Sequence, residues 1–261
     1  MNLEKTYIIC ATQRSGSTLL CHLLASTHQA GSPKEYLLPA YKSQIPFDGE
    51  NYLQYVKGNL AAYASANGVS GVKMMEKNFS DLLKRLHSSH HIAGNSHLET
   101  LRDVFPGVKF IFITRRNKLR QAISLSRAEQ TNQWEKHACS ISSTEKNQRF
   151  FITPFYVKSA VQRVLKREAE WRNFFQDNGI TPYIITYEEL VRNPTLHIHK
   201  ILDFLEIPNV TEVEVSSPTL RRQADFYTEF LILYYRSYFL LRHLLPEPIW
   251  QLAQRFKNQY L

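Results

Sequence analysis

The sequence has little cysteine and glycine and no long uninterrupted hydrophobic run. Its 261 residues include three cysteines, Cys10, Cys21 and Cys139, whose number and spacing give neither a disulfide framework nor a metal-binding pattern. This favours a reducing compartment, and we expect a cytoplasmic protein. The N-terminal residues carry Glu4 and only a short apolar run, unlike a signal peptide, and no apolar segment is long enough to span a bilayer.

Charge and hydrophobic content bound the class of protein. The 32 Lys and Arg residues exceed the 23 Asp and Glu residues, so the formal net charge is +9, which favours an anionic partner. No basic block has interleaved aromatic residues, so we expect no nucleic-acid partner. A hydrophobic fraction of 43% allows a sizeable core. Because no repeat or linker is evident, we expect a single domain over residues 1–261.

Residues 7–20 predict a strand, a short polar turn and a helix, and the rest of the chain is organised around them. The first part is apolar and rich in β-formers, and the leucines between 19 and 24 share one helix face. The turn and first helical residues are Gln13, Arg14, Ser15, Gly16, Ser17 and Thr18. Turn N–H groups, a helix dipole and an arginine together favour a phosphate or sulfate ligand. The alternative interpretation is an ordinary strand–turn–helix capped by Ser and Thr.

This turn does not match the phosphate-binding loop of nucleoside triphosphatases, G-x-x-x-x-G-K-[ST]. Gly16 is its only glycine, and no lysine precedes Ser17 and Thr18. ATP hydrolysis is therefore disfavoured, and so is a P-loop kinase. The histidines His87 and His90 also lack Cys or acidic partners at ligand spacing, as does His91, so we expect no metal site.

Alternating β-rich and amphipathic segments predict an α/β fold with a central parallel sheet flanked by helices. Further strands are expected at 68–75, 108–114 and 183–187, and helices at 52–63, 82–86, 98–105, 118–130, 155–178 and 196–205. Residues 188–194 are predicted to form a turn. The apolar segment 226–245 is interrupted by Arg236 and Arg242, so it is either a core or homodimer helix or a peripheral membrane contact.

Polar residues at the predicted strand ends supply candidate chemistry. Arg115 and Arg116 follow the strand 108–114, and Ser124 lies two helical turns later, a combination that suits a phosphate monoester. Glu35 lies in a turn expected at the carboxyl edge of the sheet, where it is either a salt-bridge partner or a general base. A further basic cluster that could close over a nucleotide contains Arg222, Gln223 and Asp225.

Taken together, these motifs resemble sulfotransferases of the bacterial Stf0 type, whose best-known member sulfates trehalose. The matching segments run in order along residues 6–230, at 13–20, 31–36, 71–75, 114–131 and 222–225. The resemblance implies a P-loop NTPase-like three-layer sandwich. It also implies transfer of a sulfuryl group from 3′-phosphoadenosine 5′-phosphosulfate to a hydroxyl of a carbohydrate or glycolipid acceptor. The alternative is a regulatory protein that binds a nucleotide but has lost transfer.

The resemblance assigns roles to the candidate residues. Residues 13–18 would hold the 5′-phosphosulfate, and residues 222–225 would help to enclose the nucleotide. Either Arg115 or Arg116, together with Ser124, would bind the 3′-phosphate. This register stays open, because Arg116 fits the wider R-x₇-S spacing whereas Arg115 aligns with the arginine of the Stf0 type.

The same resemblance assigns the catalytic residues. Glu35 matches the proposed general base of the family, and Arg14 with Lys73 would stabilise charge on the leaving oxygen. The sequence departs from the family pattern at Ser32, Glu76 and Ser126. We interpret these three positions as shaping the acceptor side.

Overall fold

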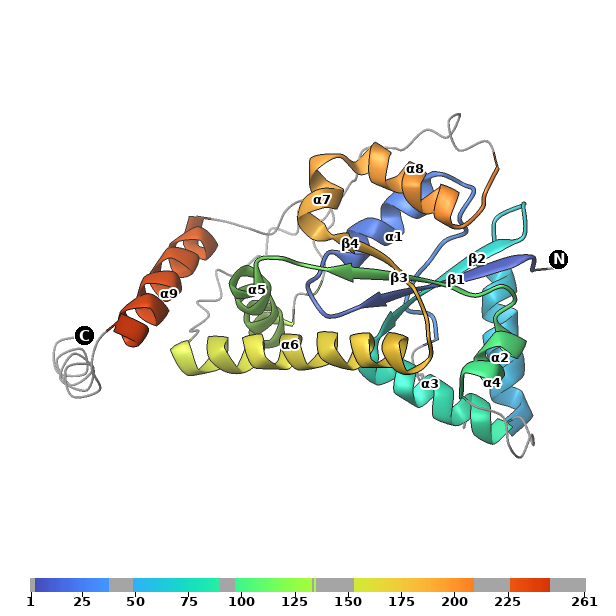
Figure 1. The fold of residues 1–261 in the computed structure, drawn as a ribbon, viewed down its shortest axis with the longest axis horizontal. Coiled ribbons are helices and arrows are strands. Elements are labelled where there is room, and N and C mark those ends of the chain that lie inside the picture. Colours follow the sequence, from blue (N-terminus) through green and yellow to red (C-terminus); the bar gives the residue numbers. More distant parts are fainter. Residues whose placement is uncertain are drawn as a thin grey trace. The chain divides into compact units, whose positions relative to one another are not determined.

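The computed structural model describes residues 3–37, 49–89, 97–132, 134, 153–208 and 226–244 (Figure 1). The chain divides into two compact units, which are described separately. The first comprises residues 1–116 and 162–220, and the second comprises residues 117–161 and 221–261. The expectation of a single domain stays a prediction.

The first unit is built on a sheet of four parallel strands, in the order β2-β1-β3-β4. The strands are β1 (Lys5–Ala11), β2 (Val69–Met75), β3 (Lys109–Thr114) and β4 (Tyr183–Thr186). In the central strand β1, Ile9 is paired with Lys73 on one side and Ile111 on the other. Because helices cover both faces, β1 to β3 are almost continuously buried, which explains their apolar sequences. The predicted strands and their parallel arrangement are confirmed.

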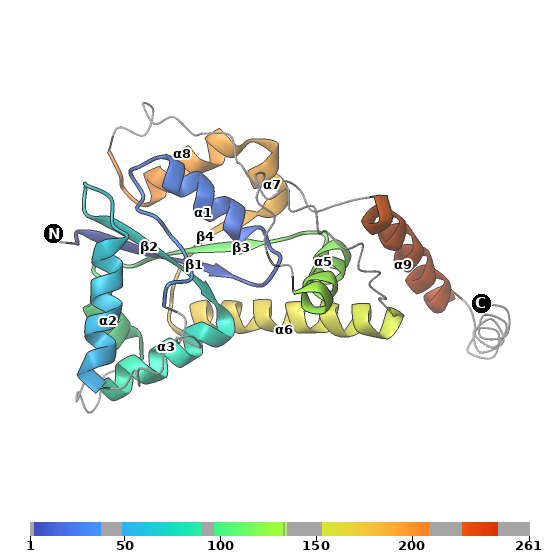
Figure 2. The same cartoon turned by 180° about the vertical axis from the view of Figure 1, so that it is seen from behind.

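Helices form a layer on each face of this sheet (Figures 1 and 2). One face carries α1 (Ser17–Ser26), α7 (Tyr187–Arg192) and α8 (Pro194–Phe204). The other carries α2 (Gly49–Ala62), α3 (Glu76–Ser89), α4 (His97–Val104) and the part of α6 (Pro154–Asp177) that belongs to this unit. Side chains of β1 pack on both faces of the sheet. Tyr7 and Ile9 belong to the core beneath α1 and α8, and Ile8 belongs to the core that contains Trp171. The three-layer α/β fold is confirmed.

The strand order places a topological switch point at β1 and β3. The chain leaves β1 for β2 on one side, and then returns past β1 to form β3 on the other side. In open parallel sheets, ligands bind beyond the carboxyl ends of the strands at such a point. The segments that follow these two strands are Thr12–Gly16 and Arg115–Arg116, which belong to two of the three basic segments singled out in the sequence.

The second unit contains α5 (Lys118–Thr131), α9 (Phe226–Leu244) and the first part of α6. Hydrogen bonds join α9 to α5, because the Arg120 guanidinium donates to both carboxylate oxygens of Glu229 at 2.6 Å and Arg127 Nη1 donates to Thr228 Oγ1 at 3.4 Å. The side chains of Leu231 and Tyr235 on α9 are buried. The apolar segment is thus a packed helix, and no helix in the described part of the chain is apolar enough over sufficient length to cross a membrane. Homodimerisation and membrane contact stay predictions.

One element differs from its prediction. Residues 188–194 were expected to form a turn, but residues 187–192 form the short helix α7. Its start is fixed by a capping box in which the Thr186 hydroxyl accepts from the Glu189 N–H and the Glu189 carboxylate accepts from the Thr186 N–H. Several of the residues named above lie outside the described residues, namely Cys139, His90, His91, Arg222, Gln223 and Asp225.

Candidate active site

The loop between β1 and α1 has the compact geometry expected of an anion site. Its turn is closed by a hydrogen bond from the Ser15 N–H to the Thr12 carbonyl at 3.3 Å. Arg14 has a φ of +61° and Gly16 a φ of +96°, both in the left-handed region. A left-handed arginine is uncommon and costs conformational energy, and such strain concentrates at ligand-binding segments.

The N-terminus of α1 presents donors without a competing acid. Gly16 caps the helix without any side-chain hydrogen bond, and the first turn contains no acidic residue. The Ser15 side chain is fully buried, and within the described ranges its hydroxyl has no hydrogen-bond partner. An unpartnered buried hydroxyl next to a helix N-terminus is the environment that a phosphate or sulfate group would complete. The loop therefore fits an anionic ligand.

Arg115 brings a second positive charge to this loop. Its guanidinium donates from Nη1 to the Arg14 carbonyl oxygen at 3.3 Å and stacks on the Tyr187 ring, 4.6 Å from the ring centroid. The same ring packs against Gly16, where an added Cβ would lie 2.4 Å from the Tyr187 Cδ2 atom. Tyr187 thus supports the loop and the arginine together.

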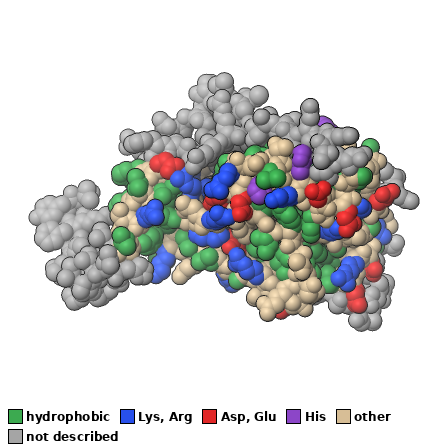
Figure 3. All heavy atoms as spheres, turned by 45° about the horizontal axis from the view of Figure 1, so that its top comes forward, with side chains coloured by type: hydrophobic (Ala, Val, Ile, Leu, Met, Phe, Trp, Pro, Cys, Tyr) green, Lys and Arg blue, Asp and Glu red, His purple; other side chains and the backbone are tan. Residues whose placement is uncertain are grey.

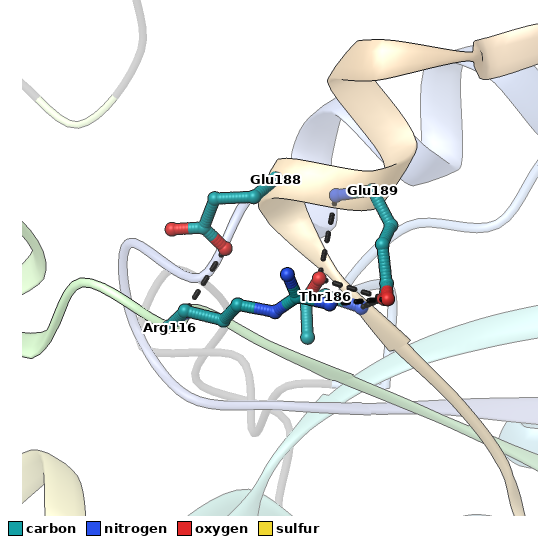
Figure 4. Close-up of polar contacts among 4 residues, drawn as sticks. All are labelled: Arg116, Thr186, Glu188 and Glu189. Carbon is teal, nitrogen blue, oxygen red and sulfur yellow. Dashed lines mark hydrogen bonds and ion pairs between the residues drawn. The ribbon is translucent and has the colours of Figure 1, made fainter.

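Arg116 contacts the acidic residues at the start of α7 (Figure 4). Its backbone N–H donates to Glu188 Oε2 at 2.9 Å, and its exposed guanidinium pairs with the Glu189 carboxylate. Hydrogen bonds from the Thr186 hydroxyl and N–H, with a smaller effect of Arg116, lower the pKa of Glu189. Arg116 therefore takes part in the cap of α7, whereas its neighbour Arg115 contacts the anion loop.

The predicted base, the predicted cation and the loop are in direct contact. Lys73 Nζ lies 2.8 Å from Glu35 Oε1 and donates to Thr18 Oγ1 at 3.2 Å. The Lys73 side chain is 8% exposed, whereas that of Glu35 is 28% exposed. A buried lysine thus holds a carboxylate that solvent, and so an acceptor hydroxyl, can reach. Three segments far apart in sequence meet here, at the start of α1.

The neighbours of Glu35 fix its backbone to the edge of β2. The Lys73 N–H donates to the Lys34 carbonyl at 3.0 Å, and Lys34 forms a parallel bridge with Val72. On the other side of Glu35, the Tyr36 hydroxyl donates to the Gly71 carbonyl at 2.9 Å. The Glu35 carboxylate is therefore presented from a segment that is tied to the sheet on both sides.

Sequence reasoning missed the contribution of α6 to the site. The Arg167 guanidinium donates to the side-chain oxygen of Gln13, and the buried Trp171 indole donates to the Ala11 carbonyl at 3.1 Å. Both residues lie more than 150 positions from their partners, so no local motif links them. The only available signal was their spacing of four, which places them on one helix face.

The remaining candidates are less defined by the structure. Ser124 lies on α5 in the second unit, and its role in donor binding stays a prediction. Within the described ranges, no group of three or more His, Cys, Asp or Glu side chains could hold a metal ion. On the face drawn in Figure 3, acidic side chains lie among the Lys and Arg side chains.

Comparison with known proteins decides the class of this site. The sequence model of the Stf0 sulphotransferase family matches residues 6–237. The chain belongs to this family. It is therefore an enzyme of the sulfotransferase class, and the kinase and non-catalytic alternatives are set aside. The match includes residues of both compact units.

Individual proteins are similar to this chain over most of its length. The chain is 27% identical over 249 residues to a trehalose 2-sulfotransferase of Mycobacterium tuberculosis (strain ATCC 35801 / TMC 107 / Erdman). The alignment covers 85% of this chain and 90% of the relative. It is 28% identical over 251 residues to the trehalose 2-sulfotransferase of Mycolicibacterium smegmatis. That alignment covers 84% of this chain and 90% of the relative. A crystal structure of a sulfotransferase from Alicyclobacillus acidocaldarius aligns with a TM-score of 0.44 at 14% identity, over 91% of this chain and 93% of that one.

Proposed function

We propose that this Stf0 sulphotransferase transfers a sulfuryl group from 3′-phosphoadenosine 5′-phosphosulfate to a hydroxyl of a carbohydrate, with Glu35 as the general base. The observation that carries the proposal is the contact of Lys73 with both Glu35 and Thr18. The candidate base, a cation and the N-terminus of a helix without a side-chain cap lie together there. In-line transfer needs these three groups together, because they serve the nucleophile, the leaving oxygen and the transferred group.

The donor is proposed to bind along the anion loop. Residues 13–18 offer turn N–H groups, the hydroxyl of Ser15 and the arginine of the loop to the phosphosulfate end. Of the two candidate arginines for the 3′-phosphate, Arg115 is favoured, since its guanidinium contacts the loop whereas Arg116 pairs with Glu189. Ser124 is proposed to complete that subsite. Arg222, Gln223 and Asp225 keep their proposed role in enclosing the nucleotide.

The acceptor is proposed to be a sugar hydroxyl, and trehalose is the first compound to test. Both relatives described above are named trehalose 2-sulfotransferases, and the chain covers 90% of each. A glycolipid that carries the same sugar stays within the proposal, because the reacting hydroxyl would be the same. The departures at Ser32, Glu76 and Ser126 concern the acceptor side and could change which sugar fits.

The proposed mechanism follows from the charges at the site. Glu35 accepts the proton of the acceptor hydroxyl while the hydroxyl oxygen forms a bond to sulfur. The bond between sulfur and the phosphate oxygen of the donor breaks at the same time. Negative charge then develops on that leaving oxygen, where Lys73, Arg14 and the loop N–H groups stabilise it. By analogy with phosphoryl transfer, positioning and charge stabilisation provide most of the rate enhancement. Proton transfer to Glu35 would also weaken its ion pair, which leaves Lys73 available to the leaving oxygen.

The experiment that tests the proposal uses the donor labelled in its sulfuryl group, with trehalose as acceptor. We expect a trehalose monosulfate by mass spectrometry, and we expect adenosine 3′,5′-bisphosphate to bind in calorimetry. If the label is transferred to another compound in a host extract and not to trehalose, the proposal of trehalose as acceptor is overturned and the donor assignment stands. Absence of bisphosphate binding would overturn the donor assignment.

A further inference from the structure

One turn of α6 holds both the end of β1 and the start of the anion loop. Trp171, 1% exposed, donates from its indole to the Ala11 carbonyl, and Arg167, four residues earlier, donates to the Gln13 side chain. Gln13 directly precedes Arg14, whose backbone adopts the left-handed conformation. The orientation of the loop is therefore connected to the position of a single guanidinium.

We propose that Arg167 is a positioning residue for sulfuryl transfer, acting through its hydrogen bond to the Gln13 side chain. This inference rests on the proposed function, since it assumes that the loop binds the donor. The packing of α6 against β1 does not depend on Arg167, because Trp171 is buried there independently.

The first test compares variants of α6 in the transfer assay. For Arg167→Ala we expect kcat to fall on the order of 10²-fold, the effect of a small misplacement at a reacting centre, while the acceptor KM changes far less. Arg167→Lys should recover part of the loss, because an ammonium group can still donate to Gln13. Lys158→Ala is the matched control, since it removes an exposed positive charge from the same helix. Equal kcat values for Arg167→Ala and Lys158→Ala would overturn the proposal.

A second test, with the variant Arg14→Ala, separates this inference from the proposed function. Arg14→Ala should weaken binding of adenosine 3′,5′-bisphosphate, whereas Arg167→Ala should leave that binding close to the wild-type value. If Arg14→Ala binds the bisphosphate normally, the donor loop is wrongly assigned and the proposed function fails. If Arg14→Ala fails to bind but Arg167→Ala transfers normally, only the further inference fails.

Discussion

Lys73 Nζ lies 2.8 Å from Glu35 Oε1, and this ion pair joins a buried cation of the central sheet to a carboxylate that is partly exposed. The two residues are 38 positions apart in the sequence. They meet because Lys34 is bridged to Val72, so that each residue of the pair directly follows a bridging residue. The backbone of the sheet, rather than a flexible loop, therefore fixes the distance between base and cation.

The first prediction concerns the base. Glu35→Gln keeps the size of the side chain but removes its ability to accept a proton, so transfer should fall roughly 10²–10⁴-fold. Binding of adenosine 3′,5′-bisphosphate should stay close to the wild-type value, since the donor loop is untouched. Steady-state transfer and calorimetry on the same preparation check this. Transfer at the wild-type rate would remove Glu35 from the mechanism.

The second prediction concerns the cation. Lys73→Met keeps the length of the buried side chain and removes its charge, so kcat should fall about 10²–10³-fold through lost stabilisation of the leaving oxygen. The Glu35 carboxylate left behind can hydrate because it is partly exposed, so the protein should still fold. Lys34→Met is the control, since the ammonium group of this exposed lysine lies over the ring of Tyr63 and the substitution leaves its backbone bonds in place. Similar kcat values for the two variants would contradict the assignment.

The sequence predicted the elements around the candidate site where its signals were local. The strand, the turn and the helix around Arg14 are contiguous, so periodicity and residue type sufficed for these elements, and the structure confirms them. The role of Glu35 as the base comes from the family resemblance and stays a prediction. The contact of Arg167 with Gln13 depends on how α6 packs beneath the sheet, which no short pattern encodes. The helix α7 is a different case, because Thr186 and Glu189 form a capping-box pattern that was present in the sequence and was read as a turn.

The third prediction separates the two neighbouring arginines. Arg115→Ala should weaken bisphosphate binding about tenfold or more, since a charge-assisted hydrogen bond contributes about 1.5–3 kcal/mol. Arg116→Ala should bind the bisphosphate normally, because its guanidinium pairs with the surface residue Glu189. Calorimetry on the two variants under identical salt conditions decides the register. The reverse order of affinities would assign the phosphate to Arg116.

The fourth prediction concerns the cap of α1. Gly16→Ala introduces a Cβ at a φ of +96° and 2.4 Å from the Tyr187 Cδ2 atom. The left-handed conformation alone should cost about 1–3 kcal/mol of unfolding free energy, measurable by urea denaturation. Because Tyr187 also carries Arg115, the clash should weaken bisphosphate binding as well. Gly58→Ala is the control, since that glycine is helical and a Cβ there meets nothing within 4 Å. Equal unfolding free energies for the two variants would contradict the prediction.

The last prediction is the pH dependence of the α7 cap. Hydrogen bonds from Thr186, with a smaller effect of Arg116, lower the pKa of Glu189 in the folded state. A carboxyl group with a lowered folded pKa stabilises the protein above its unfolded pKa, about 4.3 for Glu. That contribution is lost as pH falls through the folded value. The difference in unfolding free energy between wild type and Glu189→Gln should therefore be largest at neutral pH and shrink below about pH 4. Thermal or urea unfolding across this range measures it, with the exposed Glu4→Gln as control, and a difference that grows toward acid pH would contradict the capping role.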